Sequence, residues 1–340
     1  MKKIFYIFLT GALFTVVFST CKEEDYSTKE YYKNVIYLLS KENYNVYNQP
    51  CAFDDGNRVI GYLSIGCGGS RPNGEEFTVE LEPDTILFDK YNTGNFDIDT
   101  AKFAKLLPEN RYLLEKYKVT FPANNPDQYV KLKIRINPDS LSPDSIYFIP
   151  LAIKNVSNSY EINEKKFNVL FRIAVENYFA EQLADTYYRL MGVINPLDET
   201  NRITVAASKM VRPLSKNSVR VFAGSTVQTS KSTVDSIKKH SIVVTVDPPK
   251  DMDFVKNRAK VTIKPYAMGK TGYRIELDTI LTAAEGWNIY EEFPQSAISN
   301  KMTKEFKLHY RYRTAKTVAD GKVTQWNNWI EIQEILTRLE

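Results

Sequence analysis

The chain of 340 residues is 43% hydrophobic and 25% charged, and its formal net charge is +4. This composition is typical of globular proteins with real cores, and the length suits two ordinary domains. The basic residues are spread along the chain without an arginine-rich tract or a basic helix. Nucleic acid is therefore not expected as a partner.

The first residues of the chain predict secretion. Lys2 and Lys3 precede an uncharged run over residues 4–20, and small residues lead up to Cys21. A basic start, a short apolar middle and a small-residue exit are the layout of a cleaved secretory signal. We therefore predict a signal peptide over residues 1–20.

The end of this signal resembles the lipobox of bacterial lipoproteins. Phe18, Ser19, Thr20 and Cys21 follow its order, with phenylalanine where leucine is usual. The resemblance implies that the thiol of Cys21 is acylated and that this residue becomes the new N-terminus. Several acyl chains hold a protein on its membrane, because each buried methylene contributes about 0.8 kcal/mol. An ordinary cleaved signal followed by a chance cysteine is the alternative.

Charged residues follow the cysteine directly. Residues 22–25 read KEED, and this run resembles the surface-export signal of Bacteroidetes lipoproteins. The resemblance implies an outer-membrane protein, lipid-anchored and facing the cell exterior. A solvated linker is the other interpretation, since such a composition is also normal for linkers. We predict that residues 21–33 form a flexible acidic tether.

Residues 34–176 are predicted to form an antiparallel β-sandwich. Val130, Leu132, Ile134 and Ile136 alternate with charged residues, a period of two that buries one face of a strand. The same period recurs, with turn-forming clusters between the runs, at residues 77–81, 147–153 and 167–175. One insert, at residues 100–117, is predicted to be helical or irregular, in two pieces divided at Pro108.

Residues 177–340 contain a second set of predicted strands. Their number suits a closed or nearly closed barrel, which removes exposed edges, and a second sandwich is the competing interpretation. The predicted strands lie at residues 187–191, 202–206, 218–222, 241–246, 259–265, 273–278, 304–313 and 329–336.

Both halves carry a family resemblance. Segments at 33–38, 77–92, 106–124 and 134–158 look like the N-terminal sandwich domain of Bacteroidetes surface lipoproteins encoded beside SusC/SusD-type glycan importers. The second half is similar to the lipocalin-like domain that often follows that sandwich, at residues 179–190, 304–314 and 326–339. The resemblance implies an all-β protein, with an immunoglobulin-like antiparallel β-sandwich followed by a lipocalin-like β-barrel. It also implies polysaccharide or oligosaccharide binding in support of capture and import, with a SusC/SusD-type importer as a partner.

The sequence offers little for catalysis. Of the two histidines, His240 belongs to no metalloprotease pattern, and His309 lies within a predicted strand, where a structural role is expected. Ser236 and Lys239 match a four-residue spacing that lacks its partner motifs. No cofactor or metal is expected. Carboxylates that folding brings together can still hydrolyse glycosides without any sequence signature.

Two cysteines remain besides the predicted anchor. In an oxidising envelope Cys51 and Cys67 could form a disulfide that closes a small loop. Two buried free thiols are the alternative.

Aromatic residues are plentiful, with 22 Tyr, 18 Phe and 3 Trp. Sugars present flat apolar faces fringed with hydroxyls, so a sugar site needs an amphipathic ring and a few polar groups. Trp287 lies in a predicted loop with Asn288 and Tyr290 close by, and Trp326 lies beside two asparagines. We predict these four residues as glycan-binding candidates. For Trp329, core packing or the start of the last strand is the favoured interpretation.

Three classes of function stay open at this point. The leading class is a non-catalytic glycan binder at the cell surface. The second is a structural or adhesive surface protein, such as a fimbrial or host-contact component, whose β domains need no small ligand. The third is a glycan-acting hydrolase.

Overall fold

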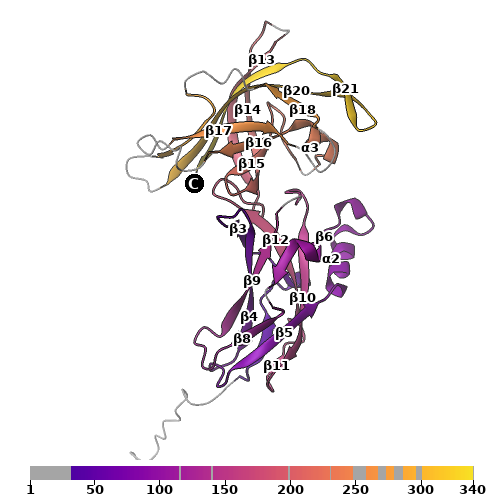
Figure 1. Cartoon of the computed structure of the whole chain (residues 1–340), viewed down its shortest axis with the longest axis vertical. Helices are drawn as coiled ribbons and strands as arrows, with labels where there is room; N and C mark the ends of the chain where they lie inside the picture. The colour runs from indigo at the N-terminus through magenta and orange to yellow at the C-terminus, as the bar shows by residue number, and fades with distance from the viewer. Residues whose placement is uncertain are drawn as a thin grey trace, which may run out of the picture.

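The protein folds into two β domains that follow one another along the long axis of the molecule (Figure 1). A computed structural model describes residues 32–114, 116–138, 141–197, 200–229, 231–247, 258–266, 273–278, 286–295 and 301–339. The predicted signal peptide, Cys21 and nearly all of the predicted tether lie outside the described residues. Within the described part of the chain, no helix is both long enough and apolar enough to span a bilayer.

The first domain is built from twelve strands, one α-helix and three single turns of 3-10 helix. The strands are β1 (Val35–Leu38), β2 (Val46–Tyr47), β3 (Pro50–Phe53), β4 (Val59–Gly68), β5 (Phe77–Pro83), β6 (Lys105–Leu106), β7 (Tyr112–Leu114), β8 (Lys118–Phe121), β9 (Tyr129–Ile136), β10 (Tyr147–Val156), β11 (Glu161–Ile162) and β12 (Asn168–Glu176). The helices are α2 (Ile86–Phe96), η1 (Asn43–Asn45), η2 (Thr100–Lys102) and η3 (Glu109–Arg111).

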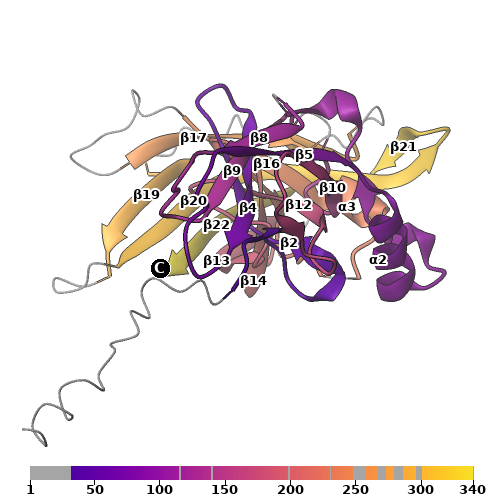
Figure 2. The same cartoon turned by 90° about the horizontal axis from the view of Figure 1, so that it is seen from below.

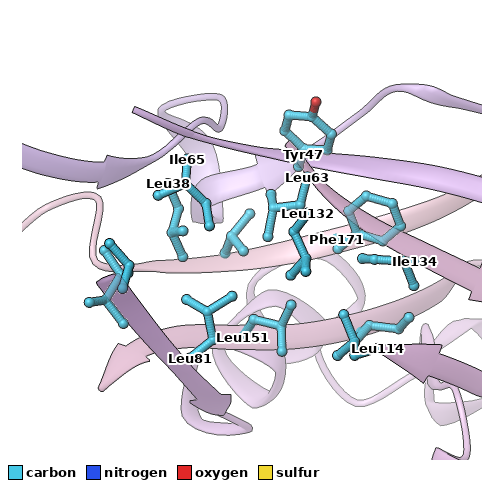
Figure 3. Close-up of a cluster of buried hydrophobic side chains, with 14 of the residues drawn as sticks. Leu38, Tyr47, Leu63, Ile65, Leu81, Leu114, Leu132, Ile134, Leu151 and Phe171 are labelled. Atoms are coloured by element: carbon cyan, nitrogen blue, oxygen red, sulfur yellow. The ribbon is translucent and has the colours of Figure 1, made fainter. Parts of the chain in front are cut away.

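These strands form two layers that share one core. In one layer β4 pairs with β1, β3 and β9, and in the other β10 pairs with β5 and β12. Strand β12 joins the layers, because its last residues pair with β3 while its first part pairs with β10. Figure 3 shows the buried side chains that both layers contribute, among them Leu63, Leu132, Leu81 and Leu151. The predicted strand periods at residues 77–81 and 130–136 are those of β5 and β9, whose apolar residues belong to this core.

The helix of this domain lies where the sequence did not predict one. The described residues of the insert at 100–117 form two 3-10 turns, one on each side of Pro108, and short strands, so the insert is irregular and the helical alternative is wrong. The α-helix is α2, just before it, on the flank of the sandwich in both views (Figures 1 and 2). It buries only Phe88 and Asn92, so its sequence carries almost no periodic signal. Tertiary contact of Phe88 with Phe148 stabilises it instead.

The two cysteines of the sandwich are free buried thiols. Cys51 lies on β3 and Cys67 on β4. Burial raises the pKa of Cys51 to about 12 and that of Cys67 to about 11. Because the thiolate is the reactive form, both thiols are inert in this fold.

The second domain contains ten described strands and one short helix. The strands are β13 (Thr186–Pro196), β14 (Ile203–Ser215), β15 (Ser218–Phe222), β16 (Ser241–Val246), β17 (Arg258–Pro265), β18 (Ile275–Asp278), β19 (Ile289–Pro294), β20 (Met302–Ala319), β21 (Lys322–Trp326) and β22 (Ile330–Leu339). The helix is α3 (Val234–His240). The strand predicted at 218–222 coincides with β15, and that at 241–246 with β16.

The antiparallel pairings of this domain form a ring. They run from β13 through β14, β15, β16, β17, β19 and β20 to β22, and β22 pairs with β13 again. The predicted all-β architecture is therefore confirmed, and the ring favours a barrel over a second sandwich. The immunoglobulin-like and lipocalin-like assignments stay predictions. The loop predicted around Trp287 is wrong for its second half, because β19 begins at Ile289 and pairs with both β17 and β20.

The inside of the ring holds one buried ion pair among its apolar side chains. Lys209 of β14 and Glu334 of β22 are 1% and 0% exposed and lie 2.5 Å apart. The hydroxyl of Tyr310 donates a hydrogen bond to the same carboxylate at 2.6 Å, and Lys209 also donates to the backbone oxygen of Phe222 at 2.8 Å. These partners satisfy both charges, as a buried ion pair requires.

The two domains have separate cores but share a polar interface. The core of the sandwich ends at Val175, and that of the second domain begins at Phe179. Across the junction, fully buried Arg220 of β15 binds both carboxylate oxygens of Asp144, and Gln228 bonds to both residues. A bidentate arginine–carboxylate pair fixes orientation as well as distance. This contact therefore sets how one domain sits on the other.

Acid should loosen this interface. Burial raises the pKa of Asp144, but the hydrogen bonds and charge of Arg220 outweigh burial and leave the pKa below its usual value. In the unfolded chain an aspartate has a pKa near 4, and above that pH the folded protein gains the full stabilisation from a carboxylate whose pKa is lowered. This stabilisation is lost as the pH falls through the lower pKa that the carboxylate has in the folded protein. In small-angle scattering, we expect the wild-type particle to become longer only at strongly acidic pH.

The variant Asp144→Asn provides the matched control. It keeps the shape of the side chain but not its charge, so its particle should already be longer at neutral pH, and it should change less on acidification. Identical scattering of the two proteins at neutral pH would contradict a role of Asp144 in holding the domains.

Candidate functional site

A recess lined by aromatic side chains opens on the second domain, beside the edge strand β18. Its volume is about 710 Å³, and its walls include Tyr273, Glu276, Asp278, Trp326 and Trp329. Strand β18 pairs with residues 311–314 in the middle of β20, and Trp326 is the final residue of β21, the strand that forms a hairpin arm with the last part of β20 (Figure 1). The recess therefore lies at the base of this arm.

The two indole rings are held by one arginine. The guanidinium carbon of Arg313 lies 5.3 Å from the ring centroid of Trp326 and 4.8 Å from that of Trp329. The same guanidinium donates to Glu276, its opposite neighbour on β18, with Nε 2.7 Å from the carboxylate oxygen. A cation on an aromatic ring contributes about 0.5–1 kcal/mol at an exposed site. Arg313 therefore orients both rings in the absence of any ligand.

The link between β21 and β22, which carries the second indole, is also fixed. The backbone nitrogen of Asn327 donates to the backbone oxygen of Thr314 at 2.9 Å, and its side-chain amide donates to the hydroxyl of Thr314 at 2.9 Å. On the other side, Leu197 donates its backbone N–H to the carbonyl of Trp329. Asn328, in the middle of this link, is exposed.

The recess combines the two features that a sugar site needs. The half-buried indoles and Tyr273, which is 54% exposed, present ring faces. Asp278 and Glu276 line the same space and supply oxygen atoms that accept hydrogen bonds from hydroxyl groups. Rings for stacking and a few acceptors for orientation suit a sugar better than a purely apolar ligand.

Trp287 lies outside the recess but on the same face of β20. It follows Gly286 in the turn before β19 and is half-buried. Its ring meets that of His309 edge-on, with 5.9 Å between the centroids. His309 is 6% exposed, and its Nε2 lies 2.8 Å from the carboxylate of Glu331. His309 therefore supports Trp287 from below, in keeping with the structural role expected for this histidine.

The structure places Asn288 in a supporting position. Its side-chain oxygen accepts from the backbone nitrogen of His309 at 2.9 Å, and its amide nitrogen donates to the backbone oxygen of the same residue at 3.1 Å. Strand β19 pairs with β20 only up to Lys307, and β18 begins pairing at Arg311. Between these two pairings, the side-chain amide of Asn288 makes the hydrogen bonds to the backbone of His309 that a neighbouring strand would otherwise make.

Tyr290 lines a second cavity, at the junction of the domains. This cavity has a volume of about 650 Å³, and Phe53 and Tyr178 also line it. Tyr290 is 2% exposed, and its hydroxyl donates to Glu292. Burial and the Glu292 carboxylate raise the pKa of Tyr290 well above its usual range. The structure thus separates the four predicted residues, and only Trp326 lines the tryptophan recess.

Sequence reasoning missed three residues of this site. For Trp329, core packing or the start of the last strand was the favoured interpretation; it does come directly before β22, yet it also lines the recess three positions after Trp326. Tyr273 and Arg313 belong to segments that only the pairing of β18 with β20 brings to the indoles. The sequence WNNW was the one available signal, since two tryptophans flanking two asparagines are unlike a buried strand. Among the described residues, no three His, Cys, Asp or Glu side chains are placed to hold a metal ion.

Comparisons with known proteins identify the family. One family model, for an N-terminal domain, matches residues 31–160, and a second, for the C-terminal domain, matches residues 167–337. The chain belongs to this two-domain family. No curated protein matches it.

Solved structures share the fold of this two-domain chain. A Bacteroides ovatus protein of unknown function is 14% identical, with 90% of this chain and 94% of that one covered and a TM-score of 0.59. A multidomain protein of the same species is 14% identical, with 89% and 94% covered and a TM-score of 0.58. An auxiliary nutrient binding protein from Bacteroides thetaiotaomicron is 13% identical, with 83% of each chain covered and a TM-score of 0.51. At these identities the likeness shows a common two-domain architecture.

The supporting position of Asn288 makes a testable prediction. Asn288→Ala leaves the backbone N–H and carbonyl of buried His309 without partners, at about 1–3 kcal/mol for an unsatisfied buried group. Alanine also disfavours the φ of 55° that this position adopts. We expect the free energy of unfolding to fall by about 2 kcal/mol in urea titrations. The exposed Asn328→Ala should change it by less than about 0.5 kcal/mol, and equal stability of the two variants would refute the assignment.

Proposed function

We propose that the protein is a non-catalytic glycan-binding protein and that the tryptophan recess is its binding site. The observation that carries the proposal is the pair of indole rings held around Arg313 beside exposed Tyr273. A site whose rings are already oriented loses little conformational entropy on binding. A low entropic cost matters for sugars, because each of their hydroxyl groups exchanges a hydrogen bond to water for one to the protein and gains little binding free energy.

The shared fold supports this proposal from a second direction. One protein with the same two-domain architecture is an auxiliary nutrient binding protein from a Bacteroides species. A role in nutrient capture is therefore compatible with this arrangement of domains. Capture at the cell surface, and delivery to a SusC/SusD-type importer, are the corresponding parts of the proposal.

The chemistry of the recess favours binding over hydrolysis. A glycoside hydrolase needs one protonated carboxylic acid and one free carboxylate beside the scissile bond. Here one carboxylate oxygen of Glu276 lies 2.7 Å from Nε and 2.6 Å from an Nη atom of Arg313, so this side chain is already engaged in an ion pair. It is therefore not free to act on a scissile bond. A bound oligosaccharide should accordingly be recovered intact after incubation.

Removing either indole should weaken binding. Each ring face contributes about 0.5–1.5 kcal/mol of stacking, so Trp326→Ala and Trp329→Ala should each raise the dissociation constant by about twofold to tenfold. Affinity gels containing one polysaccharide each, run with a panel of neutral and acidic polysaccharides, identify the ligand and report retention. Tyr62→Ala is the matched control, because Tyr62 is an aromatic residue that is 45% exposed on the other domain.

The outcomes of this experiment are distinct. Loss of retention in both tryptophan variants, with Tyr62→Ala unchanged, supports the recess as the site. Retention of the wild type on none of the polysaccharides would count against glycan binding and in favour of a structural or adhesive surface protein. Shortening of the retained glycan would establish a hydrolase.

Surface anchoring is the second part of the proposal, and Cys21 carries it. Cells that express the full chain and are fed labelled palmitate should incorporate the label into the protein, and external protease should digest it in intact cells. Cys21→Ala should abolish labelling, since no other residue can accept the lipid in this scheme. A labelled Cys21→Ala protein, or an unlabelled wild type, would contradict lipid attachment at this residue.

A further inference from the structure

We propose that the tryptophan recess is one end of a longer binding path along β20, and that this path takes an extended, uncharged glycan chain. The inference rests on the proposed function and adds the class of ligand to it. Two independent features carry it. One is the position of Trp287, and the other is the balance of charges along the path.

The path follows from the alternation of side chains on β20. Phe306, Leu308, Tyr310 and Tyr312 face the core of the second domain, so His309, Arg311 and Arg313 share the opposite face. His309 and Arg313 are four residue steps apart along the strand, which is about 13 Å. Trp287 rests on the ring of His309 at one end, and the indoles of the recess flank Arg313 at the other. A single sugar ring is too short to reach both ends.

Polar side chains occupy the middle of the path. Arg311 lies between the two ends and is 31% exposed, and its Nε is 3.9 Å from the carboxylate of Glu331. Asp278 is opposite Arg311 in the pairing of β18 with β20. An aromatic ring at each end and hydrogen-bonding groups between them suit a chain of sugars, with stacking at the ends and hydroxyl contacts in the middle.

The charges on this face balance one another. Five basic residues face five acidic ones in the same strip, and four of the five basic side chains lie within 4 Å of a carboxylate oxygen. The basic residues are Arg258, Lys260, Lys307, Arg311 and Arg313, and the acidic ones are Glu276, Asp278, Glu291, Glu305 and Glu331.

This balance selects against acidic glycans. A uronate or sulfate group would meet a face with no excess of positive charge, and it would have to break an existing ion pair to reach an arginine. Electrostatic attraction of a polyanion needs a field of one sign, which this strip lacks. A neutral chain has no such cost.

Chain length provides the first test. Oligosaccharides from the disaccharide upward, prepared from the neutral polysaccharide that the affinity gels identify, are titrated into the full chain by calorimetry. The affinity of the wild type should rise by about tenfold once the chain spans both ends of the path. For Trp287→Ala the loss of affinity should grow with chain length, whereas Trp329→Ala should weaken every length.

Ligand charge provides the second test. The wild type should be retained by neutral gels such as starch, mannan, xylan or β-glucan, and not by polygalacturonate, alginate or heparin. Glu331→Gln removes the carboxylate beside His309 and Arg311 while keeping the shape of the side chain. This variant should gain retention on acidic gels, and added salt should abolish the gain.

The outcomes separate this inference from the proposed function. A wild type that prefers an acidic polysaccharide, or a Trp287→Ala variant that matches the wild type at every chain length, overturns the inference. In either case the recess still stands as the site if Trp326→Ala and Trp329→Ala lose binding. Only the absence of any glycan binding refutes both.

Discussion

One strand, β20, is the element on which the second domain and its site depend. It runs from Met302 to Ala319 and pairs with β18, β19, β21 and β22. Its inner face supplies core residues such as Phe306 and Tyr310, and its outer face carries the arginine that holds the indoles. A strand of this length must satisfy its backbone groups along both edges. The amide of Asn288 meets that requirement where β19 has ended and β18 has not begun.

The same residues that stabilise the outer face shape the site. Arg313 is at once an ion-pair partner of Glu276 and the support of two ring faces. An arginine in two such contacts loses its side-chain conformational entropy when the protein folds and not when a ligand binds. A rigid site of this kind therefore binds a ligand with a smaller entropic cost. The site is therefore a consequence of strand pairing, and no dedicated loop is required to build it.

This origin explains what the sequence could predict and what it could not. Period-two runs such as those of β5 and β9 marked the strands, because burial of one face leaves a local signal. The helix α2 buries only two side chains and left no such signal. In β19, Glu291 and Glu292 made a paired strand look like a polar loop, since their partners Arg258 and Tyr290 become evident only in the fold. Trp326 was predicted as a ligand contact, but Arg313 and Tyr273 were not, because non-local pairing alone brings them to the indoles.

The contact between the domains bears on how such a site would be presented. The described chain begins at the end of the sandwich that points away from the second domain (Figure 1). The buried pair of Arg220 and Asp144 fixes the second domain at the other end. If the chain is tethered through its N-terminal segment, the sandwich acts as a rigid spacer and holds the tryptophan face about one domain away from the membrane. In that arrangement a flexible junction would let the face turn toward the lipid, so the buried ion pair at the interface would serve presentation of the proposed site as much as stability.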